Sequence, residues 1–263
     1  MRKFGTRAFV AVALFSVALV STEAAAETAK PPAARNIVLV HGAWADGSSW
    51  AAVIPLLQAA GLRVTAVQNP LTSLADDAAA TRRALAHVDG PTVMAAHSWG
   101  GTVMSEVGAD PKVTALVYVA ARAPDAGEDP AALAAKFPTG PARAGALEHD
   151  GFIVLSEDTF LKYFANGVPR RKAEVLYAVQ QPVTVSLFAG RTTVAAWRMK
   201  PSYYALSLRD QTIPPEMQRF LAARMKAHTV TVNAGHLALV SHPREIADVI
   251  LAAAGRGTPN AKR

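Results

Sequence analysis

The sequence of 263 residues contains no cysteine. It can therefore form no disulfide, hold no metal ion through thiolates and carry no lipid on a cysteine. Charged residues are also sparse, at 18% of the chain, and the net charge of +7 is scattered rather than gathered into a basic stripe with interleaved aromatic residues. Nucleic-acid binding is therefore disfavoured, and the charge is more consistent with a role in solubility.

Long hydrophobic runs are absent except near the N-terminus, where residues 8–20 are apolar. This run of about 13 residues is shorter than the roughly 20 that span a bilayer. It follows three basic residues and precedes three alanines at positions 24–26, which is the pattern of a cleaved export signal. The sequence therefore predicts a signal peptide over residues 1–26, a mature chain that begins near Glu27, a periplasmic or secreted protein, and no stable membrane anchor. Loss of the signal would lower the net charge to about +5.

Strand-length apolar runs alternate with segments of helical periodicity after a short linker predicted over residues 27–35. The predicted strands of the first half cover residues 36–41, 62–68, 91–97 and 112–121, with helices beginning near Trp50, after Ser73 and just after Ser98. This alternation is typical of a mostly parallel sheet with crossover helices. The apolar content of 51% is ample for its core.

The alternation stops between about residues 123 and 198, where proline and glycine clusters, many aromatic residues and a predicted hairpin near residues 149–156 occur. We interpret this segment as an inserted cap. The alternation then resumes with a strand at residues 202–208, a helix at 215–228, a strand at 229–233 and a helix at 245–254. The sequence thus predicts one domain over residues 36–254 and a flexible tail over residues 255–263.

The stretch AAHSWGG, residues 95–101, is close to the turn Gly-x-Ser-x-Gly, but Ala96 occupies the first glycine position. That turn needs small residues two positions before and after the serine, because a helix and a strand pack closely there. Ala96 is larger than glycine by one methyl group, and Gly100 meets the requirement fully. Functional groups gather at the carboxyl ends of strands in open α/β sheets. We therefore expect Ser98 to be a nucleophile rather than an ordinary serine beside two glycines.

A serine hydroxyl needs a base to take its proton and an acid to orient that base. His236, in the loop after the last predicted strand, is the candidate base, and Asp210, directly after the strand at 202–208, is the candidate acid. Asp210 has an alternative interpretation as a helix cap, and Asp125 is a competing acid. His97 adjoins the serine but is expected to face the other side of the strand end.

Acyl transfer also requires two backbone N–H groups that stabilise the developing negative charge. Trp99, at the start of the helix, is expected to supply one, and Ala43, in a loop that Gly42 allows to turn, is expected to supply the other. A plain turn at the end of the strand is the alternative for this loop. The aromatic residues of the cap favour an apolar substrate, although the alternative for most of them is that they simply form part of the hydrophobic core. The predicted substrate-binding residues are Trp44, Trp99, Phe164 and Leu237.

Four segments together carry a family resemblance: VLVHGAWADGSSW, AAHSWGG, RDQTIPP and AGHLALVSHP. In this order and spacing they resemble the α/β-hydrolase superfamily over roughly residues 36–252, in particular the branch of plant methylesterases, hydroxynitrile lyases and related bacterial serine hydrolases. The resemblance implies an α/β-hydrolase fold with an inserted cap and no cofactor. It also implies a Ser98, Asp210 and His236 triad, with an oxyanion hole formed by the N–H groups of Ala43 and Trp99.

Two positions bear on the reaction. The hydroxynitrile lyases of this branch carry a threonine where this chain has Gly42, and a lysine where it has Leu237. That lysine supplies positive charge for the leaving cyanide, which a leucine cannot do. Superfamily members with an aspartate nucleophile are disfavoured by Ser98.

We therefore expect hydrolysis of a small to medium apolar or aromatic carboxylic ester through an acyl-enzyme. A lactonase, a carbon–carbon bond hydrolase or a perhydrolase with the same triad stays open, as does a non-catalytic ligand-binding protein on a hydrolase scaffold. The residues leave the oligomeric state open.

Overall fold

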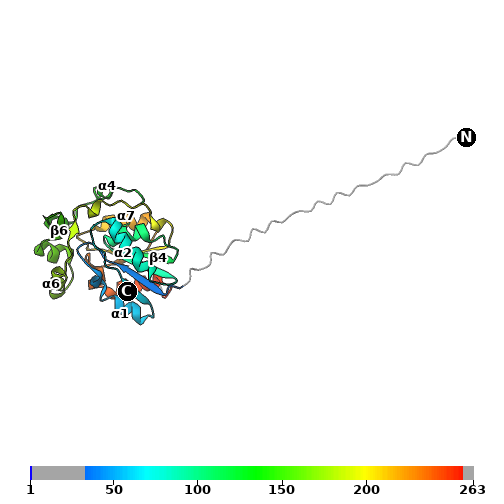
Figure 1. Ribbon diagram of the computed structural model, residues 1–263, viewed down its shortest axis with the longest axis horizontal. Helices are drawn as coiled ribbons and strands as arrows, with labels where there is room; N and C mark the ends of the chain where they lie inside the picture. Colours follow the sequence, from blue (N-terminus) through cyan, green and yellow to red (C-terminus); the bar gives the residue numbers. More distant parts are fainter. Residues whose placement is uncertain (2–32, 257–263) are drawn as a thin grey trace. The chain divides into compact units, whose positions relative to one another are not determined.

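A computed structural model describes Met1 and residues 33–256 of the chain (Figure 1). Apart from Met1, the predicted signal peptide at residues 1–26 lies outside the described residues, as do most of the predicted linker and the end of the predicted tail. Among the described residues, no helix has both the length and the apolar character needed to cross a membrane.

A six-stranded, all-parallel sheet forms the centre of the domain, with the strand order β2-β1-β3-β4-β8-β9. Its strands are β1 (Asn36–Val40), β2 (Arg63–Ala66), β3 (Thr92–His97), β4 (Val113–Val119), β8 (Ser202–Ser207) and β9 (His228–Val232). The residues of β1 and β3 are all buried, whereas β2 and β9 at the two edges are largely exposed or half-buried. Burial on both faces explains why the inner strands read as unbroken apolar runs. The predicted parallel sheet with crossover helices is confirmed.

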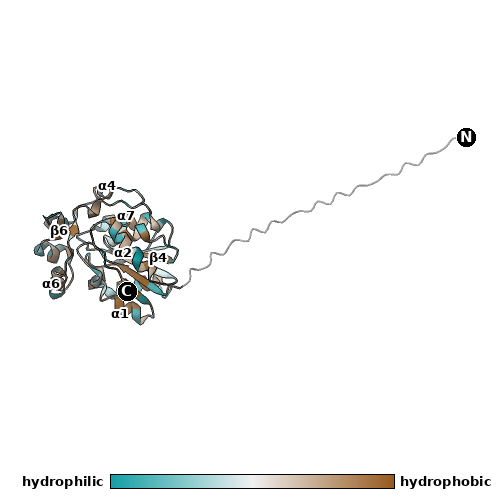
Figure 2. Ribbon diagram, viewed as in Figure 1, coloured by the Kyte–Doolittle hydropathy of each residue, from teal (hydrophilic) through white to brown (hydrophobic). Residues whose placement is uncertain are grey.

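Helices cover both faces of this sheet. α1 (Ile54–Ala59) and α9 (Pro243–Ala253) share one apolar core with one face of the strands; α2 (Leu74–Ala86), α3 (Gly100–Val107) and α7 (Pro215–Arg224) share a second core with the other. Ser73 caps α2 by accepting a hydrogen bond from the N–H of Asp76, as the sequence predicts. In Figure 2 the central strands are largely hydrophobic, whereas the helices around them carry both hydrophobic and hydrophilic residues, as expected when one side of a helix packs on a sheet.

The segment between β4 and β8, here called the cap, contains a second, three-stranded sheet. Its elements are α4 (Pro130–Ala134), η2 (Pro141–Gly145), β5 (Ala146–His149), β6 (Phe152–Leu155), α5 (Glu157–Thr159), η3 (Phe160–Phe164), α6 (Arg170–Ala178), β7 (Val183–Thr184), η4 (Leu187–Ala189) and η5 (Ala196–Arg198). Asp150 and Gly151 join β5 to β6 with positive φ angles of 49° and 78°, which suit a tight two-residue hairpin. The predicted hairpin is therefore confirmed. Figure 1 shows β6 and α6 at the edge of the domain opposite to the β4 label.

Candidate active site

Ser98 occupies a sharp turn between β3 and α3, here called the elbow. Its φ angle is +52°, a left-handed conformation that costs a residue with a side chain about 1–2 kcal/mol. A Cβ on Gly100 would lie 2.6 Å from the carbonyl oxygen of His41 and 2.7 Å from that of Val40, so the second glycine of the motif is required sterically. Strain held in place by close packing is typical of functional sites.

The imidazole of His236 lies between the hydroxyl of Ser98 and the carboxylate of Asp210. Its Nε2 is 2.9 Å from the Oγ of Ser98, and its Nδ1 is 2.8 Å from the Oδ2 of Asp210. Because a carboxylate only accepts, this network assigns the proton to Nδ1 and leaves Nε2 to accept from the serine hydroxyl. Ser98 is only 7% exposed and His236 is fully buried, so the contacts are shielded from bulk water. The structure thus brings together the three residues that the sequence proposes as a triad.

Asp210 is held by more than His236. Its Oδ1 accepts hydrogen bonds from the backbone N–H groups of Thr212 (2.7 Å) and Ile213 (2.9 Å), and its Oδ2 accepts one from the side-chain amide of Gln218 (2.8 Å). These donors fix the carboxylate in the turn before α7, and α7 itself has no side-chain cap. The helix-cap interpretation of Asp210 is therefore wrong. Gln218 is a contact that the sequence analysis missed.

The competing acid, Asp125, is engaged elsewhere. Its carboxylate pairs with the guanidinium of Arg198, with one contact of 2.8 Å from Nε to Oδ1. Hydrogen bonding to Arg198 lowers the pKa of Asp125. Among the described residues, Asp210 is the carboxylate that contacts His236.

His97, which the sequence analysis placed away from the serine, contacts His236 directly. Its Nε2–H donates to the backbone carbonyl of His236 at 3.0 Å, and the two ring centroids lie 4.6 Å apart. Burial first, and then the neighbouring imidazole of His236, hold the pKa of His97 well below its usual value. His97 is therefore neutral at physiological pH and packs against the imidazole that contacts Ser98. The position of His97 directly before Ser98 in the sequence was the signal from which this contact could have been expected.

The loop after β1 presents a second set of polar groups to the elbow. His41 is fixed at both ring nitrogens: Nδ1–H donates to the carbonyl of Gly42 (2.9 Å), and Nε2 accepts from the N–H of Asn69 (2.9 Å). Ala43 and Trp99 are both buried, yet their backbone N–H groups find no acceptor among the described residues. Buried N–H groups without partners are rare in folded proteins, so these two require an explanation.

Position 42 has no room for a side chain. A Cβ there would lie 2.8 Å from the Cβ of Ser98 and 3.0 Å from the Nδ1 of His97. The threonine of the resembling lyases would therefore require the loop or the elbow to move.

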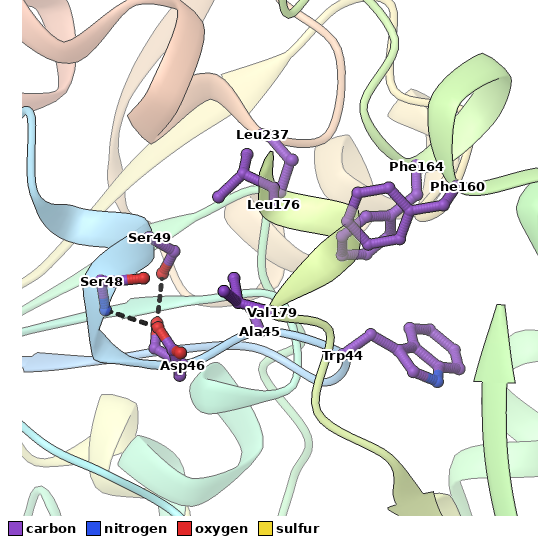
Figure 3. A pocket seen from close by; sticks show the side chains of 10 residues that line it. All are labelled: Trp44, Ala45, Asp46, Ser48, Ser49, Phe160, Phe164, Leu176, Val179 and Leu237. Carbon is purple, nitrogen blue, oxygen red and sulfur yellow. Dashed lines mark hydrogen bonds between the residues drawn. The ribbon is translucent and has the colours of Figure 1, made fainter. Parts of the chain in front are cut away.

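An apolar pocket adjoins this site at Leu237, the residue after His236 (Figure 3). Its wall is formed by Trp44, Ala45, Asp46, Ser48, Ser49, Phe160, Phe164, Leu176, Val179 and Leu237. In Figure 3 the rings of Phe160 and Phe164 lie together, with Trp44 beside them. Three of the four predicted substrate-binding side chains, those of Trp44, Phe164 and Leu237, therefore line one pocket.

Trp99 does not line this pocket. Its indole is buried, its Nε1–H donates to the Oδ2 of Asp77 at 2.8 Å, and its ring meets the ring of Phe188 edge-on at 5.8 Å. Among the described residues, no group of three or more histidine, aspartate or glutamate side chains is arranged to hold a metal ion.

Comparison with known proteins agrees with the fold. A family model described as "Alpha/beta hydrolase family" matches residues 37–249. A pyrethroid hydrolase from Sphingobium faniae is 22% identical over 84% of this chain and 98% of its own, with a TM-score of 0.69. Polyneuridine aldehyde esterase is 19% identical over 83% of this chain and 98% of its own, with a TM-score of 0.73.

A methylesterase from Arabidopsis is also similar in structure. It is 18% identical over 84% of this chain and 98% of its own, with a TM-score of 0.69. No curated protein matches the chain in sequence. Because the family model covers most of the chain, including β1, the elbow and the loop of His236, the chain belongs to the alpha/beta hydrolase family.

Proposed function

We propose that the protein is a serine hydrolase that cleaves a small to medium apolar or aromatic carboxylic ester through an acyl-enzyme. The observation that carries this proposal is the buried chain of hydrogen bonds from Ser98 through His236 to Asp210. A histidine that accepts from a serine hydroxyl on one nitrogen and donates to a carboxylate on the other can take up the proton of that hydroxyl.

The proposed reaction has two halves. In the first, His236 removes the proton of Ser98 as Oγ attacks the ester carbonyl carbon; the C–O bond then breaks, and the alcohol leaves with the proton from His236. In the second, His236 takes a proton from water, the resulting hydroxide attacks the acyl carbon, and Ser98 leaves as the hydroxyl with that proton restored. Asp210 holds the imidazole and stabilises its protonated form throughout.

The unpartnered N–H groups of Ala43 and Trp99 are explained as donors to the oxyanion of each tetrahedral intermediate. Each such donor typically lowers the activation free energy by about 3–4 kcal/mol. This role, for Ala43 in the loop after β1 and for Trp99 at the elbow, accounts for two buried N–H donors that have no acceptor among the described residues.

The pocket beside Leu237 supports an apolar substrate group. Its lining is mostly aliphatic and aromatic, which suits an alkyl or aryl group. The cavity volume is about 10 Å³, room for roughly one water molecule, so this pocket accepts an alkyl or aryl group only after its lining side chains move. The structural neighbours include a pyrethroid hydrolase and two esterases, which agrees with ester cleavage.

The proposal is tested by assaying purified protein and the Ser98→Ala variant on short-chain and aryl esters. We expect the variant to lose at least about 1,000-fold in kcat. A fluorophosphonate should label the wild-type protein stoichiometrically at Ser98, as read by peptide mass spectrometry. Equal turnover by the two proteins, or absence of labelling, would contradict the proposal and favour a non-catalytic ligand-binding protein.

We further propose that the chain is exported with removal of residues 1–26, on the pattern of basic, apolar and small residues in that segment. Expression of the full chain in a Gram-negative bacterium, followed by N-terminal sequencing, is expected to show a mature protein in the periplasm or medium that begins near Glu27. Intact protein retained in the cytoplasm would contradict this.

A further inference from the structure

Arg122 lies just beyond the carboxyl end of β4, beside the elbow. Its backbone N–H donates to the carbonyl of Ser98 at 3.0 Å. Its guanidinium carbon is 5.4 Å from the ring centroid of Phe188, a distance typical of a cation–π contact. The ring of Phe188 in turn contacts those of Trp44 and Trp99, at 5.4 Å and 5.8 Å between centroids.

This aromatic cluster connects the guanidinium to two residues next to the elbow and to the loop after β1. Trp44 directly follows Ala43, and Trp99 directly follows Ser98. The guanidinium is therefore joined, through the ring of Phe188, to the residues that carry or directly follow the proposed oxyanion-hole donors.

Arg122 has no counterion within the described part of the chain. Its side chain is half-buried and makes neither an ion pair nor a hydrogen bond with any described residue. The nearest acidic residues in sequence are already engaged: Asp125 pairs with Arg198, and Glu128 pairs with Arg224. A guanidinium carries five N–H donors, so all of its donors are available to a ligand.

Leaving this cation unpaired has an energetic cost. Burial, and to a smaller extent the nearby charge of Arg143, lower the pKa of Arg122 to about 10. The side chain still carries its charge at neutral pH. Charges withdrawn from water in proteins are normally paired, so an unpaired, half-buried guanidinium beside a candidate active site suggests that a ligand supplies the partner.

A second cation approaches from the cap. Arg143 lies on η2, is exposed and forms no ion pair with a described residue. The N–H of Ala142, its neighbour, donates to the carbonyl of Gln211 at 3.2 Å, which fixes η2 against the loop that carries Asp210. The charge of Arg143 is near enough to Arg122 to lower the pKa of its guanidinium, so two arginines from separate elements contribute positive charge to this region.

We propose that Arg122, assisted by Arg143, binds a carboxylate group of the substrate, so that the ester cleaved at Ser98 carries a second, ionised carboxyl group. A planar guanidinium matches the two oxygens of a carboxylate, and a charge-assisted pair formed away from bulk water is strong. The apolar pocket then holds the hydrocarbon part of the same molecule. This substrate class rests on the proposed esterase function.

The test compares esters that differ only in charge. One pair places the charge on the acyl side: the para-nitrophenyl monoester of glutaric acid and the corresponding neutral amide, para-nitrophenyl glutaramate. A second pair places it on the alcohol side: para-carboxyphenyl acetate and para-carbamoylphenyl acetate. The kcat/KM ratio of anionic to neutral ester is measured for each pair with wild type, Arg122→Met and Arg143→Met. Arg83→Met controls for the change in net charge, because Arg83 is exposed on α2 and forms no ion pair with a described residue.

We expect wild type to prefer the anionic ester of at least one pair, mainly through a lower KM. Arg122→Met should reduce that preference by about 10- to 100-fold. Arg143→Met should reduce it by a few fold because its charge is exposed, and Arg83→Met should leave the ratio as in wild type. The proposal would be overturned if Arg122→Met lowered kcat/KM equally for the anionic and the neutral ester of each pair. A wild type that prefers the neutral esters would also overturn it.

A binding measurement separates this proposal from the esterase function. Ser98→Ala cannot acylate but keeps both arginines, so calorimetric titration with glutarate and with benzoate tests anion binding without turnover. Binding that disappears in the Ser98→Ala, Arg122→Met double variant supports the carboxylate site even if no ester is cleaved. Absence of binding to Ser98→Ala, in a protein that does hydrolyse esters, would contradict the carboxylate site alone.

Discussion

Asp77 is a buried carboxylate that connects α2 to the elbow. Its Oδ1 accepts from the N–H of Leu71 and its Oδ2 accepts from the indole N–H of Trp99, both at 2.8 Å. The residue is fully buried and forms no ion pair with a described residue. Burial is the main reason that its pKa is raised from 3.8 to about 6. We therefore predict that Asp77 makes folding stability depend on pH in a way that Asp77→Asn removes.

The sign and size follow from proton linkage. Between about pH 4 and pH 6 the native state keeps the proton on Asp77 whereas the unfolded chain has released it, so the free energy of unfolding falls as pH rises through this range. A pKa difference of about two units corresponds to about 3 kcal/mol. That stabilisation is fully present below about pH 4 and is lost above about pH 6.

Two buried histidines contribute with the opposite sign in an overlapping range. Burial lowers the pKa of both His41 and His97, so protonation favours the unfolded chain as pH falls. The pH dependence of the wild type alone therefore does not isolate Asp77. The difference between wild type and Asp77→Asn does, because both proteins retain the two histidines.

The assay is urea unfolding followed by circular dichroism at five pH values from about 4 to about 8. The unfolding free energy of wild type minus that of Asp77→Asn should fall by about 2–3 kcal/mol from the lowest to the highest pH. A difference that stays within about 0.5 kcal/mol across the range would refute the reasoning. It would mean that the carboxylate is solvated or paired in solution, contrary to its burial here.

Further predictions concern the small residues around Ser98 and use the ester assay with circular dichroism as the check on folding. Gly42→Ala brings a Cβ to 2.8 Å from that of Ser98, so we expect kcat to fall at least about tenfold. Activity within twofold of wild type would show instead that the loop moves to make room for the methyl group. Gly100→Ala should lower the unfolding free energy by about 1–3 kcal/mol and reduce kcat. Ala96→Gly should cost about 1 kcal/mol of stability and leave kcat near wild type; a large change in kcat would contradict the size argument at that position.

The order of strands and helices was predictable because strand-length apolar runs and segments of helical periodicity are both clear in the part of the chain that forms the sheet. Each of Ser98, Asp210 and His236 follows a strand, and the carboxyl ends of parallel strands meet at one edge, so their proximity followed from the topology. The contacts of Gln218 and His97 did not follow, because they depend on the docking of α7 and on how two imidazoles pack.

The cap was predictable only as an interruption. Its short strands and helical turns are held by contacts between distant residues, such as the indole N–H of Trp44 with the carbonyl of Ile153 at 3.2 Å. Local periodicity carries no information on such pairs. The aromatic residues of the cap therefore indicated the apolar character of the pocket but not its shape, and the sequence did not show that Trp99 lies outside the pocket that Phe164 lines.

At the first position of the elbow motif, the space available for a side chain predicts which residues are tolerated better than the glycine of the motif does. Ala96 pairs through its backbone with Val40 and Tyr118 in the middle of the sheet, and its side chain is accommodated in the buried core. A side chain on Gly100 would instead press on the backbone of β1, which cannot move without disturbing the sheet. Only the second glycine is therefore imposed by packing in this protein. A sequence pattern that requires glycine at both positions would therefore miss this protein. The positive φ angle of Ser98 and the lack of space for a side chain at Gly100 identify the turn in its structure.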